Sequence, residues 1–223
     1  VLEEPTAAAV AYQLHKKTDI SHILVYDFGG GTLDVSILYV SKGSVQVYAT
    51  DGDETLGGSD LDLCLADLIT DRLTSKHGVK EVEIQASPMQ KGGDDNENAE
   101  NDETCAGATI RVKAENAKKT LSSEKKATFS CQSKNKGHIQ FDVSRGEFER
   151  GCTHLFAAGM LPVTRLLDEL GMERSDIDEV VLVGGTTRVP RVKELLREYF
   201  GKDLNDHIDP DVTVAYGAAS VLD

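Results

Sequence analysis

The chain has 223 residues, of which 38 are acidic and 24 basic, and its formal net charge is −14. This acidic balance excludes a protein that grips nucleic-acid phosphates over a broad surface. Hydrophobic residues make up 39% and Trp is absent, which disfavours a disordered chain and a base-stacking single-strand binder. No stretch approaches the roughly 18 apolar residues that span a bilayer. We therefore expect neither nucleic acid nor membrane as a partner.

The first residues predict a helix and not a signal peptide. The chain opens without Met, a basic start or a long apolar block, so we expect a piece of a longer protein whose missing part carries any targeting signal. Pro5 suits the first position of a helix, where no amide hydrogen is needed. This helix is predicted to continue through Ala11.

Three β-rich runs follow, at residues 23–28, 33–40 and 45–50. Glycine-containing turns separate them, so the pattern predicts three adjacent antiparallel strands. The later predicted elements are a helix over 61–77, a helix over 108–123, a capped helix from Ser144 to Gly171 with a bend at Pro162, a buried strand over 179–183, a helix starting at Pro190 and a helix over 211–222.

Residues 85–107 are almost without apolar side chains, and residues 94–103 hold six acids. We interpret this segment as a solvated, mobile insertion. A calcium loop is the less favoured alternative, because the ligand spacing of an EF-hand is missing.

The four cysteines, Cys64, Cys105, Cys131 and Cys152, stand far apart and form no CxxC motif. The spacing indicates neither a zinc site nor a disulfide scaffold. We expect four free thiols and a reducing, intracellular location, with two disulfide-bonded pairs as the alternative.

Two glycine turns follow predicted buried strands. Asp27 leads into Gly29–Thr32, where consecutive glycines let backbone amides approach a polyanion, and Asp27 could hold a hydrated Mg²⁺ ion there. The second turn, Gly184–Thr187, passes from a strand into a helix, which favours an anion or a flat polar ring. Neither turn matches the P-loop or the dinucleotide fingerprint. The alternative is that both are ordinary turns without a ligand. The presence of two such turns in one chain weakens this alternative.

The helix predicted over 108–123 carries a charged stripe. Arg111, Glu115, Lys118 and Ser122 lie on one face, next to an apolar stripe that would face the core. Such a stripe could grip a ribose and a purine. For this helix alone, a solvated surface with a salt bridge is the favoured interpretation.

Six stretches occur in a distinctive order. They are residues 4–12 (EPTAAAVAY), 27–38 (DFGGGTLDVSIL), 56–62 (LGGSDLD), 115–122 (ENAKKTLS), 179–192 (EVVLVGGTTRVPRV) and 209–219 (DPDVTVAYGAA). Together, in order and in spacing, they resemble the seventy-kilodalton heat-shock protein family, the DnaK-type chaperones. The resemblance covers nearly the whole chain.

The resemblance implies an α/β architecture, the actin-like ATPase (ribonuclease H-like) fold of the family's nucleotide-binding domain, of which this chain looks like mainly lobe II. Residues 1–18 would be a crossover helix from lobe I, residues 19–56 and 145–223 lobe IIA, and residues 57–144 lobe IIB with the acidic insertion 85–107. The phosphate loop and the γ-phosphate lysine of the family's first lobe are missing. The resemblance thus implies half of a nucleotide clamp.

The resemblance also implies roles for single residues. Glu4 and Asp27 match catalytic positions near the metal and the attacking water, with Asp27 as the metal ligand. The matched nucleotide-binding positions are Gly29, Gly30, Gly31, Thr32, Asp34, Glu115, Lys118, Lys119, Ser122, Gly185, Thr186, Arg188 and Asp211. The implied cofactors are ATP or ADP with Mg²⁺, and K⁺ as a second cation, for which Asp34 matches a binding carboxylate.

Two residues depart from the family pattern. Lys119 stands where the family commonly has an Arg that stacks on adenine, which predicts weaker stacking. Ser59 replaces a frequent Glu, which puts contacts between the lobes in doubt. The acidic insertion lies in the subdomain that nucleotide-exchange factors grasp in relatives, so we expect it to alter that docking.

The resemblance implies the ATP-binding and ATP-hydrolysing lobe of a chaperone, with weak or no turnover by this chain alone. The alternatives are an exchange-factor-docking module without turnover and a sugar kinase of the same superfamily. The implied partners are nucleotide, exchange factors, J-domain co-chaperones, and unfolded polypeptides bound by a domain outside this chain. We expect a cytoplasmic location, with the endoplasmic reticulum lumen as the alternative.

Overall fold

The chain forms two compact units in a computed structural model that describes residues 2–85 and 103–220. Unit 1 comprises Val1–Gly58 and His154–Asp223, and unit 2 comprises Ser59–Thr153. The chain therefore enters unit 2 once and returns once. We describe each unit by itself.

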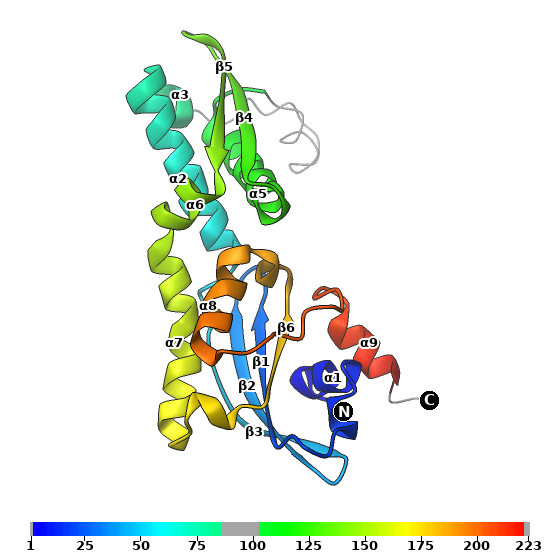
Figure 1. The fold of residues 1–223 in the computed structure, drawn as a ribbon. Coiled ribbons are helices and arrows are strands. Elements are labelled where there is room, and N and C mark those ends of the chain that lie inside the picture. The colour runs from blue at the N-terminus through cyan, green and yellow to red at the C-terminus, as the bar shows by residue number, and fades with distance from the viewer. Residues whose placement is uncertain (1, 86–102, 221–223) are drawn as a thin grey trace. The chain divides into compact units, whose positions relative to one another are not determined.

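Unit 1 is built on a four-stranded sheet in the order β3-β2-β1-β6 (Figure 1). Strands β1 (His22–Phe28), β2 (Leu33–Ser41) and β3 (Ser44–Asp53) are consecutive antiparallel neighbours, which confirms the three predicted strands. Strand β6 (Glu179–Val183) pairs in parallel with β1 on its other side. The central strand β1 is therefore hydrogen-bonded on both edges.

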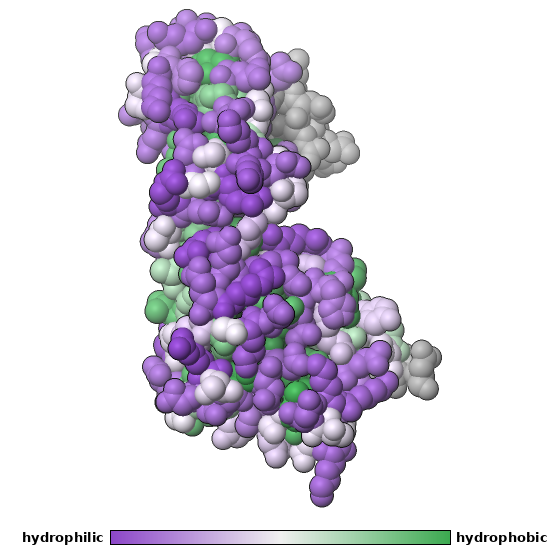
Figure 2. Space-filling model, viewed as in Figure 1, coloured by the Kyte–Doolittle hydropathy of each residue, from purple (hydrophilic) through white to green (hydrophobic). Residues whose placement is uncertain are grey.

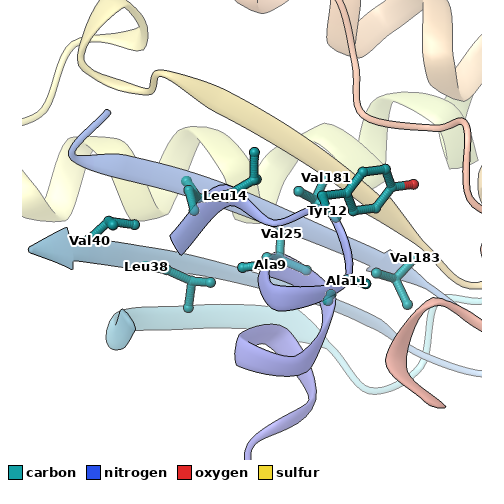
Figure 3. Packing of buried hydrophobic residues seen from close by; sticks show 11 residues of the cluster. Ala9, Ala11, Tyr12, Leu14, Val25, Leu38, Val40, Val181 and Val183 are labelled. Atoms are coloured by element: carbon teal, nitrogen blue, oxygen red, sulfur yellow. The ribbon is translucent and has the colours of Figure 1, made fainter. Parts of the chain in front are cut away.

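Both faces of β1 are buried, which explains its continuous apolar run. The Tyr26 hydroxyl donates a hydrogen bond to the carbonyl of Gly159, at 3.0 Å, in helix α7 (Thr153–Leu170). Side chains that alternate with Tyr26 point to the opposite face, where they join helix α1 (Glu4–Ala11) in a buried cluster (Figure 3). The cluster contains Ala8, Ala9, Ala11, Tyr12, Leu14, Ile23, Val25, Leu38, Val40, Val181 and Val183.

Helix α9 (Thr213–Ser220) lies beside α1 (Figure 1). The contact depends on Gly217, because a Cβ atom at this position would lie 1.8 Å from the carbonyl oxygen of Ala7. The helix that was predicted over residues 211–222 begins at Thr213. The last two residues of the predicted range lie outside the described part of the chain. As predicted, α1 carries a proline in its first turn.

The other helical elements of unit 1 follow the ends of strands and turns. They are the 3₁₀ helices η1 (Leu14–Lys16), η2 (Arg174–Asp176) and η3 (Gly185–Arg188), and helix α8 (Pro190–Phe200), which starts at the predicted proline. Hydrophilic side chains cover most of the face shown in Figure 2. Within residues 2–85 and 103–220, no helix is long and apolar enough to cross a membrane.

Unit 2 combines helices with a two-stranded hairpin. Its elements are α2 (Gly58–His77), α3 (Glu81–Gln85), α5 (Gly107–Ser123), β4 (Lys126–Ser133), β5 (Gly137–Ser144) and α6 (Arg145–Gly151). The antiparallel hairpin β4–β5 was not predicted. Its strands bury every second residue and carry lysine, serine and glutamine on the exposed side, so no apolar run marks them.

The helix predicted from Ser144 to Gly171 is two helices. The capping box is confirmed, because Ser144 accepts a hydrogen bond from the backbone amide of Glu147 and the Glu147 side chain accepts one from Ser144. The helix then ends at Gly151, and α7 begins at Thr153. The interruption lies at Cys152, with φ −105° and ψ 20°. It does not lie at Pro162, which is inside α7.

The expectation of four free thiols is wrong. Cys64 forms a disulfide with Cys152, and Cys105 forms one with Cys131, all within unit 2. The pairs are 88 and 26 residues apart in sequence, so only the tertiary fold brings them together. Cys105 is fully buried, so the solvated insertion predicted over residues 85–107 does not extend to this residue. Most of that segment lies outside the described residues.

The Gly217→Ala substitution should destabilise unit 1. Alanine favours a helix by up to about 1 kcal/mol over glycine, but here the added methyl meets the backbone of α1, which cannot move aside as a side chain could. We expect a net loss of about 2 kcal/mol in the free energy of unfolding, measured with denaturant.

The matched control for this prediction is Ala218→Ser, at the exposed neighbouring position. It should stay within about 0.5 kcal/mol of the parent chain. A Gly217→Ala chain that is more stable than the parent would show that helix propensity decides at this contact.

Candidate functional site

Two glycine turns leave the sheet of unit 1 at the same edge. Strands β1 and β6 are parallel neighbours, and Asp27 lies opposite Val183 in their register. The turns 29–32 and 184–187 therefore follow adjacent strand ends. In open α/β sheets, ligands bind outside the carboxyl ends of such strands. The Thr186 hydroxyl donates a hydrogen bond to the Gly29 carbonyl at 2.8 Å, which joins the turns directly.

The fold requires glycine at some positions of this edge and not at others. Gly184 has φ +82°, and a Cβ there would lie 2.4 Å from the Phe28 carbonyl oxygen. A Cβ at Gly57 would lie 2.3 Å from the Gly30 carbonyl oxygen. In contrast, nothing lies within 4 Å of the Cβ position at Gly30 or at Gly31. The open space over Gly30 and Gly31 leaves their backbone accessible to a ligand.

Three carboxylates gather beside the first turn. Burial, together with the negative charges of Glu4 and Asp34, raises the pKa of Asp27 to about 6. Asp34 accepts a hydrogen bond from the Thr32 hydroxyl at 3.2 Å. The raised pKa indicates negative charge that lacks a cationic partner, which fits a residue that meets a cation.

This edge offers Mg²⁺ few protein ligands. Within the described part of the chain, no three or more His, Cys, Asp or Glu side chains are arranged to hold a metal ion. Mg²⁺ commonly keeps several waters and is held by one or two carboxylates together with phosphate oxygens. Asp27 therefore fits a Mg²⁺ ion that arrives with phosphates.

A hollow of about 480 Å³ in unit 1 includes two of the predicted residues, Glu4 and Asp34. Four more acids line it, namely Glu3, Asp51, Asp53 and Glu54. Asp51 is neutralised by Arg165, whose Nε lies 2.8 Å from its carboxylate and lowers its pKa. The rest of the lining is strongly acidic and disfavours an anion bound without a cation.

The second turn is followed by an arginine held by two acids. Arg188 pairs with Asp209 and with Asp211, the latter at 2.9 Å. The Asp211 carboxylate also lies 2.9 Å from the Cβ position of Gly185, so the predicted residues Gly185, Arg188 and Asp211 lie together. Asp209 was missed as a site residue, although it opens the DPDVTVAYGAA stretch.

The predicted residues of unit 2 lie on helix α5. Its buried face contains Thr109, Ile110, Ala114, Ala117 and Leu121, which confirms the predicted apolar stripe. The charged residues form two ion pairs, Lys118 with Asp62 at 2.8 Å and Lys119 with Glu115 at 2.7 Å.

The Lys118–Asp62 pair is the more buried of the two, with the lysine side chain only 12% exposed. Burial raises the pKa of Asp62 although Lys118 opposes this effect. The Ser122 hydroxyl donates to the carbonyl of Lys118. Asp62 was missed as a site residue, and the signal for it was the LGGSDLD stretch.

The chain matches known proteins over nearly its whole length. A family model described as Hsp70 protein matches residues 1–222. Two relatives named Heat shock 70 kDa protein, from Penicillium citrinum and Emericella nidulans, are each 38% identical over 222 residues, which is 98% of this chain. The chain spans 40% of the length of the first relative and 31% of the second.

Asp27→Asn should make the chain more stable at pH 7 and flatten its pH dependence. At pH values between 3.8, the usual pKa of an Asp carboxyl, and about 6, the pKa of folded Asp27, this carboxyl is protonated more often in the folded chain than in the unfolded chain. Its contribution to the free energy of unfolding therefore falls as pH rises through this window and is constant above it. Denaturant unfolding of both chains from pH 4 to 7 measures the difference.

Asp19→Asn, at an exposed carboxyl, is the control and should give a curve parallel to that of the parent chain. Parallel curves for Asp27→Asn as well would contradict the raised pKa.

Thr186→Val should loosen the first glycine turn, because it removes the hydrogen bond to Gly29. We expect a loss of about 1 kcal/mol in stability and faster hydrogen exchange at the amides of residues 29–32. Thr187→Val is the matched control, since the Thr187 hydroxyl donates its hydrogen bond within its own turn, to the Gly184 carbonyl. Equal exchange in the two variants would show that the turns are not coupled.

Proposed function

Since the chain belongs to the Hsp70 family, we propose that it binds an adenine nucleotide as part of a chaperone's ATPase domain. The mixed α/β architecture supports this proposal at the level of the fold. The finer assignment, mainly lobe II of an actin-like fold, is supported by the sheet order β3-β2-β1-β6 with a glycine turn after β1 and another after β6.

The exposed, unobstructed pair Gly30 and Gly31 carries the proposal. The packing of the chain does not require glycine at either position, since a Cβ would meet nothing within 4 Å. A polyanion that approaches the backbone closely does require it, because a side chain would stand between the amides and the phosphate oxygens. We therefore assign the nucleotide phosphates to this turn.

The polar edge of α5 is assigned to the adenosine. Lys118 donates a hydrogen bond to Asp62, so its ammonium group is already oriented on this edge of the helix. Lys119 and Glu115 form an exposed pair that offers both a donor and an acceptor to a purine. Lysine lacks the planar guanidinium of arginine, so stacking on the base would be weak.

ATP hydrolysis is assigned to the carboxylates beside the first turn. Mg²⁺, when bound, would neutralise phosphate charge there. We assign Asp27 to holding the hydrated ion. Glu4 is close enough to Asp27 for its charge to raise the pKa of that carboxyl, and we assign Glu4 to orienting the attacking water. Catalysis would then come from positioning and electrostatics rather than from a covalent nucleophile.

Partners and location are proposals as well. The family membership supports exchange factors, J-domain co-chaperones and, through parts outside this chain, unfolded polypeptides. Of the two locations considered from the sequence, we now favour the endoplasmic reticulum lumen. Two disulfides in one unit suit an oxidising compartment better than the cytoplasm.

Gly30→Ala should weaken the binding of ADP while leaving the fold unchanged. Loss of charge-assisted backbone contacts to one phosphate predicts about a tenfold weaker affinity. Calorimetry with ADP and Mg²⁺ measures it, and adenosine, which lacks phosphates, should bind both chains equally. Ser44→Ala, at the exposed first residue of β3, is the control variant. ADP affinity that is unchanged by Gly30→Ala would refute the assignment of the phosphates to this turn.

A further inference from the structure

Two connections join unit 1 to unit 2. The chain enters unit 2 between Gly58 and Ser59, at the start of α2, and returns between Thr153 and His154, at the start of α7. Each connection thus lies in the first turn of a long helix. Any link between the start of α2 and the start of α7 therefore holds the two connections together.

The disulfide between Cys64 and Cys152 forms such a link. Cys64 lies within the first two turns of α2, and Cys152 directly precedes α7, with Cα atoms 6.1 Å apart. Beside it, Gly151 packs so closely against Leu68 that a Cβ on the glycine would lie 2.5 Å from the Leu68 Cδ1 atom. This contact does not depend on the covalent bond, so opening the disulfide loosens the link without removing it.

The two disulfides of unit 2 differ in access. Cys105 and Cys131 are 0% and 1% exposed, and Cys152 is 0% exposed. Cys64, in contrast, is partly exposed. A reducing thiolate must reach a sulfur atom to attack it. In folded unit 2, Cys64 is therefore the cysteine that a reducing thiolate can attack first.

We propose that Cys64–Cys152 is a thiol–disulfide exchange site for a dithiol reductant, and that its redox state sets how tightly the two connections between the units are held together. Regulation would then act on the covalent link rather than on the nucleotide residues. The second disulfide, between the segment before α5 and β4, would stay closed under the same conditions.

The chemistry balances with the dithiol as the two-electron reductant. One thiolate of the reductant attacks Cys64 Sγ, the Cys64–Cys152 bond breaks, and Cys152 leaves as a thiolate that takes a proton. The second thiol of the reductant then attacks the reductant's first sulfur, which is bonded to Cys64 in the mixed disulfide. This step releases Cys64 as a thiol. The reductant becomes a disulfide, and its two hydrogens end on Cys64 and Cys152.

A dithiol is favoured over a monothiol for a structural reason. After the first step, Cys152 remains beside Cys64, held there by the contact between Gly151 and Leu68. It can attack the mixed disulfide and restore the original bond, which expels a monothiol. A dithiol resolves the mixed disulfide within one molecule, so its second step competes with this reversal.

The first experiment compares the two disulfides in the 223-residue chain. Dithiothreitol is added under native conditions, newly formed thiols are alkylated at intervals, and mass spectrometry assigns them. We expect Cys64 and Cys152 to become alkylated at least about tenfold faster than Cys105 and Cys131. Equal rates for the two pairs would overturn the proposal.

The second experiment measures freedom between the units without using thiols. Spin labels on unnatural amino acids replace Tyr48 in β3 of unit 1 and Val82 in α3 of unit 2, which are 58% and 71% exposed. Selective opening of Cys64–Cys152 should broaden the distribution of label distances measured by pulsed electron resonance. An unchanged distribution would overturn the proposal.

Paired variants provide the controls. Cys64→Ser with Cys152→Ser should show the broad distribution without reductant and should not respond to it. Cys105→Ser with Cys131→Ser should keep the distribution of the parent chain and its response to the reductant. If this second variant did not respond to the reductant, the effect would depend on Cys105–Cys131 rather than on Cys64–Cys152. That result would overturn the proposal. The parent chain under reductant supplies the result even if a variant does not fold.

Discussion

The parallel pairing of β1 with β6 is the constraint on which the candidate site depends. It places two glycine turns, whose residues Gly29 and Thr186 are 157 positions apart in the chain, at the same edge of the sheet, whereas antiparallel pairing would have put them at opposite edges. The hydrogen bond from Thr186 to Gly29 then joins the turns. Gly184 permits the close approach, because any side chain there would overlap the backbone of Phe28.

The same pairing sets the electrostatics of the edge. Because β1 is covered on both faces, its last polar residue, Asp27, is partly buried among other carboxylates and has a raised pKa. Helix α5 shows the opposite arrangement, in which Lys118 and Lys119 each have an acidic partner. The chain thus combines an edge with unbalanced negative charge, suited to a cation that accompanies phosphates, with a helix on which Lys118 and Lys119 are each paired with a carboxylate.

Local signals in the sequence were reliable where one residue type has one dominant use. Pro5 and Pro190 start helices, Ser144 caps one, and the glycines of Gly29–Gly31 end a strand. The sequence signals failed for features that depend on contacts between residues far apart in the chain. The hairpin β4–β5 is stabilised by pairing and by burial of one face only, so its strands have no apolar run. The break at Cys152 coincides with a disulfide whose partner is 88 residues away.

The sequence by itself determined the family resemblance, the three antiparallel strands and the residues of both glycine turns, because these depend on neighbours along the chain. Only the tertiary structure decided that the turns share an edge, that Asp62 and Asp209 neutralise Lys118 and Arg188, and that all four cysteines are paired. Distances between residues far apart in the chain depend on how strands and helices pack, and sequence spacing does not specify that packing.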